Sequence, residues 1–266
     1  MQAVQPIAFA ELYARSCFSF LTGASHPEEL VEQAVAHGYA ALAITDECSM
    51  AGIVRAWSAW KTLPEGTLHL IIGTSLHLAD GPELVLLATD RAAYGRLSSL
   101  ITRGRRAADK GSYHLTRADL DAGLPGCLAL LIPDLTAPGG DGTGEPHECA
   151  HWLKSCFGDR AWLAAELHLG PDDAARLRAL QAIGATSGLP LCAAGDVHMH
   201  VRRRRRLQDT MTAIRLRRPV ADCGFALYPN GERHLRLPHK LTNIYPAALL
   251  ADRKSTRLNS SHANVS

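Results

Sequence analysis

AALAITDE, residues 40–47, is an apolar run that ends in two carboxylates. LPLCAAGDVHMH, residues 189–200, repeats this arrangement, with Asp196 and His198 directly after a second apolar run. Both runs have the length and the bounding residues of buried strands. Carboxylates and imidazoles that follow parallel strands gather at one end of an α/β barrel, where such folds build metal and phosphate sites. The two stretches therefore predict a barrel with polar, acidic residues at its mouth.

Apolar runs of strand length recur between these two stretches. They cover residues 68–72, 84–88, 127–132 and 161–167. Helical patterns are expected near residues 147–157 and over residues 171–187, on either side of the last run. Alternating strands and helices predict an α/β fold, with a mainly parallel sheet that is closed or nearly closed and with helices outside it.

Two helices in the first quarter of the chain carry recognisable signals. Ser25 and Glu28 have the spacing of a capping box, and Pro27 between them suits the first turn of a helix. Trp57 and Trp60 are three residues apart, which predicts one helix face packed in the core. We therefore expect one helix to begin at Ser25 and another to bury both tryptophans.

Composition places the chain among ordinary globular proteins. It has 266 residues, of which 47% are hydrophobic and 20% charged, a length that suits one α/β barrel. Seven cysteines without a C-x-x-C pair argue against a disulfide framework and for a reducing compartment. No apolar run reaches the ~18 residues of a membrane span. We therefore expect a cytoplasmic protein that does not cross a membrane.

The end of the chain differs from the rest. Residues 252–266 read DRKSTRLNSSHANVS, a polar stretch without hydrophobic periodicity, so we expect a disordered tail. The peptide resembles translated sequencing adapter found at the ends of metagenome-derived sequences. We therefore assign residues 1–251 to the folded domain and expect the natural protein to continue beyond them.

Several long stretches resemble one known family. They are FSFLTGASHPEELVEQAVAHGYAALAITDECSMAG (18–52), ELVLLATDRAAYGRLSSLITRGRR (83–106), KGSYHLTRADL (110–120) and GDVHMHVRRRRRLQDTMTAIRLRRPVADCGFAL (195–227). In this order they are similar to the PHP (polymerase and histidinol phosphatase) domain that opens bacterial C-family DNA polymerases. Within that family they are most similar to the error-prone paralogue of the DNA polymerase III alpha subunit. The similarity extends over residues 8–251.

The resemblance implies a distorted TIM-like PHP barrel with a metal cluster at its C-terminal face. Members that bind metal use an H-x-H, an acid with a histidine, a glutamate and a late D-x-H. In this chain those positions hold Tyr13 and Arg15, Asp46 and Glu47, Ser75, and Asp196 and His198. Asp196 and His198 alone keep the full pattern, and Asp46 is a third candidate ligand. The resemblance therefore implies a vestigial metal site.

Chemistry supports that expectation. Two or three ligands hold divalent cations weakly, and a permanent guanidinium charge repels them. Buried carboxylates still need a positive partner. We therefore expect Arg15 to take the place of a cation and to pair with Asp46 or Asp196, and we expect no cofactor in this fragment.

The resemblance also implies what the parent protein does. It would be a DNA-directed DNA polymerase, a nucleotidyltransferase for translesion synthesis in DNA repair, with Mg²⁺ held by palm carboxylates beyond this chain. The fragment itself would be inactive and structural. Its implied partners are the palm and thumb domains, DNA through the intact protein, a sliding clamp and mutagenesis accessory proteins.

Two other classes of function compete with this reading. One is an active metal-dependent phosphoesterase of the histidinol phosphatase type, which Tyr13, Arg15 and Ser75 disfavour. The other is a nucleic-acid-binding module that uses a basic run, whose members are Arg202, Arg203, Arg204, Arg205 and Arg206. For this run, a solvated loop or a contact with a neighbouring polymerase domain is favoured over DNA.

Overall fold

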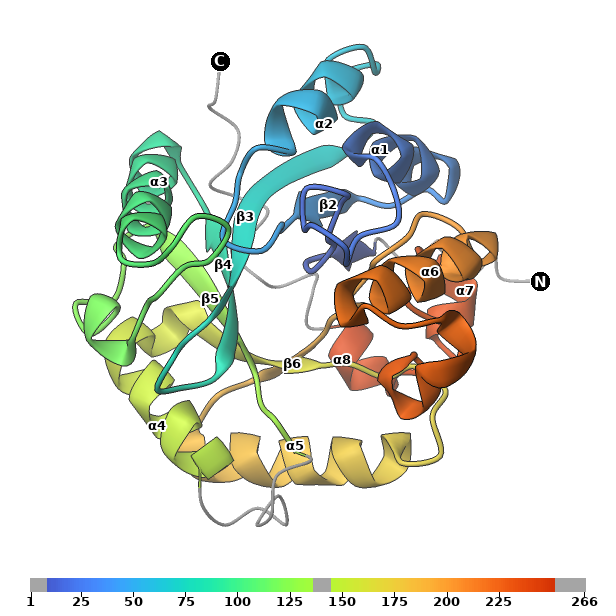
Figure 1. Cartoon of the computed structure of the whole chain (residues 1–266). Helices are drawn as coiled ribbons and strands as arrows, with labels where there is room; N and C mark the ends of the chain where they lie inside the picture. The colour runs from blue at the N-terminus through green and yellow to red at the C-terminus, as the bar shows by residue number, and fades with distance from the viewer. Residues whose placement is uncertain (1–8, 136–144, 252–266) are drawn as a thin grey trace.

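The computed structural model describes residues 9–135 and 145–251. Seven strands form one curled sheet in the order of the sequence (Figure 1). They are β1 (Ala10–Glu11), β2 (Ala41–Ile44), β3 (His69–His77), β4 (Glu83–Ala88), β5 (Cys127–Ile132), β6 (Ala161–Ala165) and β7 (Leu191–Ala193). β4 is antiparallel to both of its neighbours, and the other pairs are parallel. The prediction of a mainly parallel α/β barrel is confirmed.

Hydrogen bonds beyond the last strand close the sheet into a ring. Val197, four residues after β7, lies parallel to Ala14, three residues after β1. The amide of Val197 donates to the carbonyl of Tyr13 at 2.9 Å, and the amide of Arg15 donates to the carbonyl of Val197 at 2.8 Å. The short segments after β1 and β7 are therefore fixed against each other, and both carry predicted site residues.

Helices surround the sheet (Figure 1). They are α1 (Pro27–Ala36), α2 (Ile53–Trp60), α3 (Arg91–Arg106), α4 (Glu145–Phe157), α5 (Asp173–Ser187), α6 (Arg205–Leu216), α7 (Pro238–Leu241) and α8 (Ala247–Ala251). In the described part of the chain, none of them is long and apolar enough to cross a bilayer. The tail predicted to be disordered, residues 252–266, lies outside the described residues.

The sheet is apolar on both faces. Along β2, Ala41 and Ala43 point into the barrel, whereas Leu42 and Ile44 pack outward beneath the helices. β4 alternates in the same way, with Val85 inside and its neighbours outside. Strands buried on both faces read as continuous apolar runs, which is why the sequence revealed them.

Two local predictions were wrong. His26, not Ser25, is the N-cap of α1, and its amide donates to Glu29 Oε2 at 2.9 Å. The Ser25 hydroxyl is instead 2.7 Å from His200 Nδ1. Trp57 is 48% exposed rather than part of the core. Trp60 is half-buried and donates its indole N–H to the carbonyl of Leu68.

Replacing Leu86 tests the outer core. Leu86 in β4 is fully buried in the cluster between the sheet and the helices. We expect Leu86→Ala to lower the free energy of unfolding by about 2–5 kcal/mol, since it removes buried methyl groups and leaves a cavity. Exposed Leu207 in α6 provides the control, because Leu207→Ala should change stability by less than about 0.5 kcal/mol. Similar urea denaturation midpoints for the two variants would contradict this packing.

Candidate functional site: an ion-paired barrel mouth

The mouth of the barrel gathers residues from both ends of the chain. Arg15 follows β1, and Asp196 and His198 follow β7. Because β4 is antiparallel, its first residue, Glu83, lies beside Ile132 at the carboxyl end of β5. Glu83 therefore belongs to the same end of the barrel, although it begins a strand.

Arg15 pairs mainly with Glu83. Its guanidinium forms a close ion pair with Glu83 Oε1, and its Nε is 3.8 Å from Asp196 Oδ1. The Tyr13 hydroxyl donates to the same Glu83 oxygen at 2.6 Å. With only 11% of its side chain exposed, Arg15 is a buried cation. The expected partner Asp196 is thus a secondary one, and sequence reasoning missed Glu83 because it stands at the start of an apolar run.

Asp196 is held from three sides. Its Oδ2 pairs with Arg233, and its Oδ1 accepts from His198 Nε2 at 2.9 Å and faces Arg15. Its backbone φ of 40° lies in the left-handed region, which non-glycine residues seldom occupy. Such a conformation persists where surrounding contacts over-determine it, and here two arginines and an imidazole do so.

His198 is neutral and fully buried. Gln208 Nε2 lies 2.5 Å from His198 Nδ1, so Nδ1 accepts and the ring proton is on Nε2, facing Asp196. Burial holds the pKa of His198 well below its ordinary value, and the nearby charge of Arg15 lowers it further. The imidazole therefore contributes a hydrogen bond to the site and no charge.

Two further arginines complete the charge balance. Arg176 NH2 is 3.6 Å from Glu166 Oε2, and Arg233 lies 4.1 Å over the ring of Tyr228. Burial raises the pKa of Glu166, and the charges of Arg233 and Arg176 oppose that rise. Burial lowers the pKa of Arg233 to about 10, so its guanidinium stays protonated at neutral pH.

We name this set of charged residues the mouth network. It consists of Arg15, Glu83, Glu166, Arg176, Asp196 and Arg233. Three guanidinium groups face three carboxylates, so the network is neutral without a metal ion. Arg233 and Glu166 were not predicted, because they are distant in sequence from the other site residues and only folding brings them together.

Asp46 lies outside this ion pairing. Its buried carboxylate accepts from the Ser16 amide and hydroxyl, both at 2.7 Å, and from the Ser19 hydroxyl at 2.8 Å. Burial raises the pKa of Asp46, and these hydrogen bonds oppose the rise. The suggested pairing of Arg15 with Asp46 is therefore wrong: Asp46 fixes the loop after β1 instead.

The remaining predicted positions, Glu47 and Ser75, take part in none of these ion pairs. The Tyr113 hydroxyl donates to Glu47 Oε1 at 3.0 Å. Ser75 is fully buried, and its hydroxyl has no hydrogen-bond partner among the described residues.

The residues at the mouth do not fit a metal centre. Across the described residues, no three His, Cys, Asp or Glu side chains are grouped so that they could hold an ion. The oxygens of Asp196 already face two guanidinium groups and an imidazole N–H. A divalent cation would have to approach against that positive charge.

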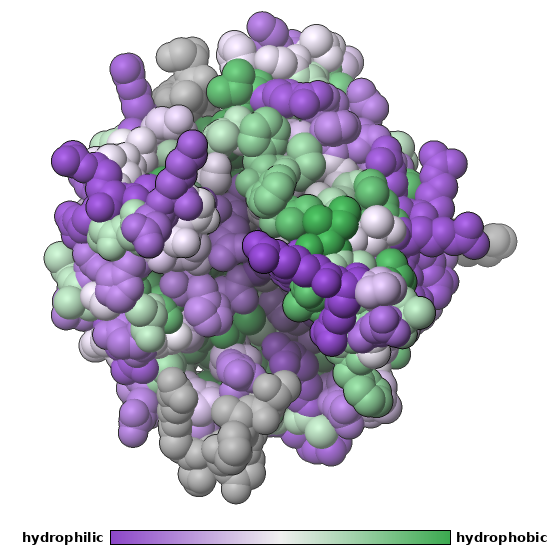
Figure 2. Space-filling model, viewed as in Figure 1, coloured by the Kyte–Doolittle hydropathy of each residue, from purple (hydrophilic) through white to green (hydrophobic). Residues whose placement is uncertain are grey.

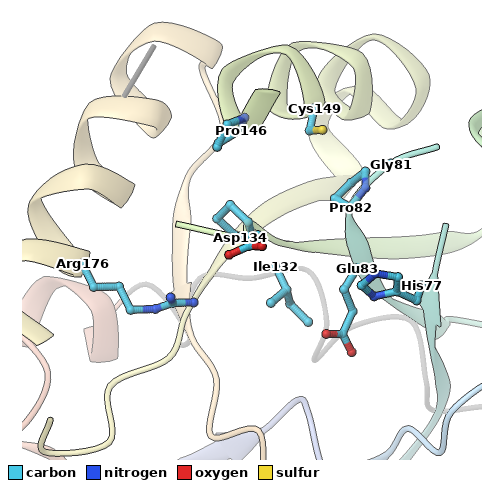
Figure 3. A pocket seen from close by; sticks show the side chains of 10 residues that line it. His77, Gly81, Pro82, Glu83, Ile132, Asp134, Pro146, Cys149 and Arg176 are labelled. Atoms are coloured by element: carbon cyan, nitrogen blue, oxygen red, sulfur yellow. The ribbon is translucent and has the colours of Figure 1, made fainter. Parts of the chain in front are cut away.

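A pocket of about 410 Å³ adjoins the mouth network. Figure 3 shows Arg176 reaching into it from α5, with Glu83 and His77 on the side of β3 and β4. Asp134, after β5, lies between them. The lining thus mixes two carboxylates with an arginine, and two of these groups already take part in the mouth network.

The basic run is helical and partly paired. Arg202, Arg203 and Arg204 form a 3₁₀ turn, and Arg205 begins α6. Three of the arginines bind carboxylates of the domain itself, in the pairs Arg202–Glu232, Arg204–Glu29 and Arg205–Asp209. The run is therefore helical rather than a loop, Arg202, Arg203 and Arg206 are exposed to solvent, and three of the five arginines also pair within the fold.

Comparison with known proteins places these features in a family. A model of the PHP domain matches residues 11–150. The chain is 55% identical over 245 residues to an error-prone DNA polymerase of Methylococcus capsulatus, and 51% identical over 249 residues to one of Dechloromonas aromatica. Each match covers 92% of this chain but only 22% and 23% of the relative. The chain thus spans less than a quarter of their length.

A solved structure shares the fold. It is that of a candidate metal-dependent phosphoesterase from Bifidobacterium adolescentis, with a TM-score of 0.53 and 17% identity. The match covers 73% of this chain and 89% of that protein. At this identity the similarity shows a common architecture.

Removing the charge of Arg15 tests the mouth network. We expect Arg15→Gln to lower the free energy of unfolding by about 3 kcal/mol, because Glu83 and Asp196 keep their charges without this partner. The double variant Arg15→Gln/Glu83→Gln should be more stable than the sum of the two single losses by at least about 1 kcal/mol. Thermal and urea unfolding of all four proteins measure this coupling.

Arg55 supplies the matched control. It pairs with Glu28 on the surface, where its side chain is 47% exposed. Arg55→Gln should therefore cost less than about 1 kcal/mol. If Arg15→Gln were as mild as Arg55→Gln, the mouth network would not be a structural element.

Proposed function

The chain belongs to the PHP domain family, and from that premise we propose that it is the N-terminal module of an error-prone DNA polymerase that acts in translesion synthesis during DNA repair. One observation carries the proposal. About half of the residues are identical, over nine-tenths of this chain, to proteins that bear the name error-prone DNA polymerase. Identity at this level over a whole domain extends far beyond a shared fold.

The proposal divides the work between this chain and the rest of its parent. The parent would be a DNA-directed DNA polymerase whose nucleotidyl transfer depends on Mg²⁺ at a palm domain. Its other proposed partners are the thumb, DNA, a sliding clamp and mutagenesis accessory proteins. The mouth network supplies no free carboxylate pair for two-metal chemistry, so this chain would contribute structure rather than catalysis.

For the mouth itself we propose a structural role in place of hydrolysis. Metal-dependent phosphoester cleavage requires cations that polarise the phosphate and activate water. Arg15 and Arg233 instead neutralise the carboxylates with fixed positive charge. Neutral His198 donates its only ring proton to Asp196. These contacts favour a vestigial site over the alternative of an active phosphoesterase.

A chimeric polymerase tests the proposed function. Residues 9–251 would replace the matching region of the M. capsulatus polymerase, which is 55% identical. We expect primer extension within about tenfold of the parent enzyme, a difference of about 1.4 kcal/mol in the barrier. A deletion of the same region is the control and should lose activity. A soluble chimera that extends no primer, beside an active parent, would refute the assignment.

Added manganese tests the vestigial site. A metal that binds the folded chain would raise its stability by about 2.7 kcal/mol at a hundred times its dissociation constant. We expect excess Mn²⁺ to shift the free energy of unfolding by less than about 0.5 kcal/mol, and p-nitrophenyl phosphate to stay intact. Release of phosphate that requires Mn²⁺ and disappears in Asp196→Asn would instead establish an active phosphoesterase.

A further inference from the structure

One segment carries much of the exposed apolar surface. Ten large apolar side chains are exposed among the described residues, and five of them lie between residues 207 and 225. They are Leu207, Ile214, Leu216, Val220 and Phe225. We call residues 205–226 the α6–η5 segment, since it contains α6, η4 (Val220–Asp222) and η5 (Gly224–Ala226). Surface apolar residues gathered in one place mark an interaction site.

The α6–η5 segment is regular although little of it is buried. Of residues 214–226, all of which the structure describes, Cys223 alone is buried. The backbone is nevertheless hydrogen-bonded, with the Arg218 amide donating to Ala213 at 3.1 Å and the Ala226 amide to Cys223 at 2.9 Å. Phe225 is fully exposed on this framework. The segment is therefore an ordered surface element that presents apolar side chains to solvent.

Helical spacing explains how α6 presents this face. Leu207, Met211 and Ile214 follow the i, i+4, i+7 pattern, so they share one side of the helix. Gln208, Thr212 and Ala213 are buried and face the barrel. The helix thus buries two polar side chains, whereas Leu207 and Ile214 are exposed.

Arginines border the apolar residues. Arg206, Arg215, Arg217 and Arg218 are exposed, and no ion pair is found for them in the described chain. Figure 2 shows apolar and hydrophilic side chains interleaved over the region where Figure 1 places α6. A partner that binds the α6–η5 segment should therefore have a contact surface that is apolar at the centre and acidic at the edge.

We propose that the α6–η5 segment is the surface on which the rest of the parent polymerase docks. The docking face of that remaining part would have an apolar centre and an acidic rim. The proposal rests on the proposed function and adds to it the face that makes the contact. More than three quarters of each relative lies outside the part matched by this chain. That remaining polypeptide is the one partner that would always be present to bind the α6–η5 segment.

Two other partners, DNA and a second copy of this chain, fit the α6–η5 segment less well. DNA binds arginines through its phosphates and stacks bases on exposed rings, and Phe225 is the one aromatic residue of this segment. The other four exposed apolar side chains, those of Leu207, Ile214, Leu216 and Val220, offer DNA neither charge nor a ring. A second copy of the chain would bring the same arginines against one another across a two-fold interface, where like charges repel.

Hydrogen exchange locates the contact. The 266-residue chain and the M. capsulatus chimera would be compared by mass spectrometry in the absence of DNA. We expect amides of residues 205–226 to exchange at least about tenfold more slowly in the chimera, because docking suppresses local opening. Unchanged exchange, protection that appears only after an oligonucleotide is added, or protection in the 266-residue chain that rises with its concentration would each overturn the proposal.

Paired variants separate docking from folding. Ile214→Ser/Phe225→Ser should abolish this protection in the chimera and leave the unfolding of the 266-residue chain unchanged. Val54→Ser, at an exposed position in α2, is the control and should preserve protection. If the chimera extends primers while residues 205–226 remain unprotected, the docking proposal fails and the proposed function stands. If the chimera is inactive, the proposed function fails, and the docking proposal that rests on it fails with it.

Discussion

Burial of carboxylates at the barrel mouth is the constraint on which this structure depends. Glu83, Glu166 and Asp196 come from the starts or ends of three different strands, and each loses most of its hydration there. An uncompensated buried charge costs several kcal/mol, so the fold is stable only if positive charge reaches the same place. Arg15, Arg176 and Arg233 provide it from segments far apart in the chain. The first strand, the fifth helix and the segment after η5 are thereby tied to one point.

Arginine and a metal ion satisfy this constraint in different ways. A metal ion is exchangeable, and it polarises bound water and phosphate, which is the basis of hydrolysis in two-metal sites. A guanidinium stays protonated, offers hydrogen bonds in a fixed plane and cannot leave the protein. Arg15 and Arg233 therefore provide a charge balance that does not depend on an exchangeable ion. The unusual backbone of Asp196 fits this view, because a strained residue is retained where several contacts hold it.

Much of the fold could be predicted from sequence because strands buried on both faces leave unbroken apolar runs, such as residues 127–132, which the structure reproduces as β5. The partners of Arg15 could not be predicted in the same way. Glu83 reaches the mouth only because β4 is antiparallel, and Arg233 arrives through a loop without periodicity. The cap at Ser25 failed for a related reason: the serine is engaged by His200, which is distant in sequence.

The barrel mouth and the α6–η5 segment are physically connected. His198 donates to Asp196 with one ring nitrogen and accepts from Gln208 of α6 with the other. Gln208 belongs to the buried side of α6, so this contact helps to fix the rotation of the helix, which decides that Leu207, Met211 and Ile214 face outward. Because a neutral imidazole is required for both hydrogen bonds, the burial that keeps His198 uncharged also maintains the link. Residues at the mouth thus help to orient a surface suited to protein contact, which is a structural role that requires no bound ion.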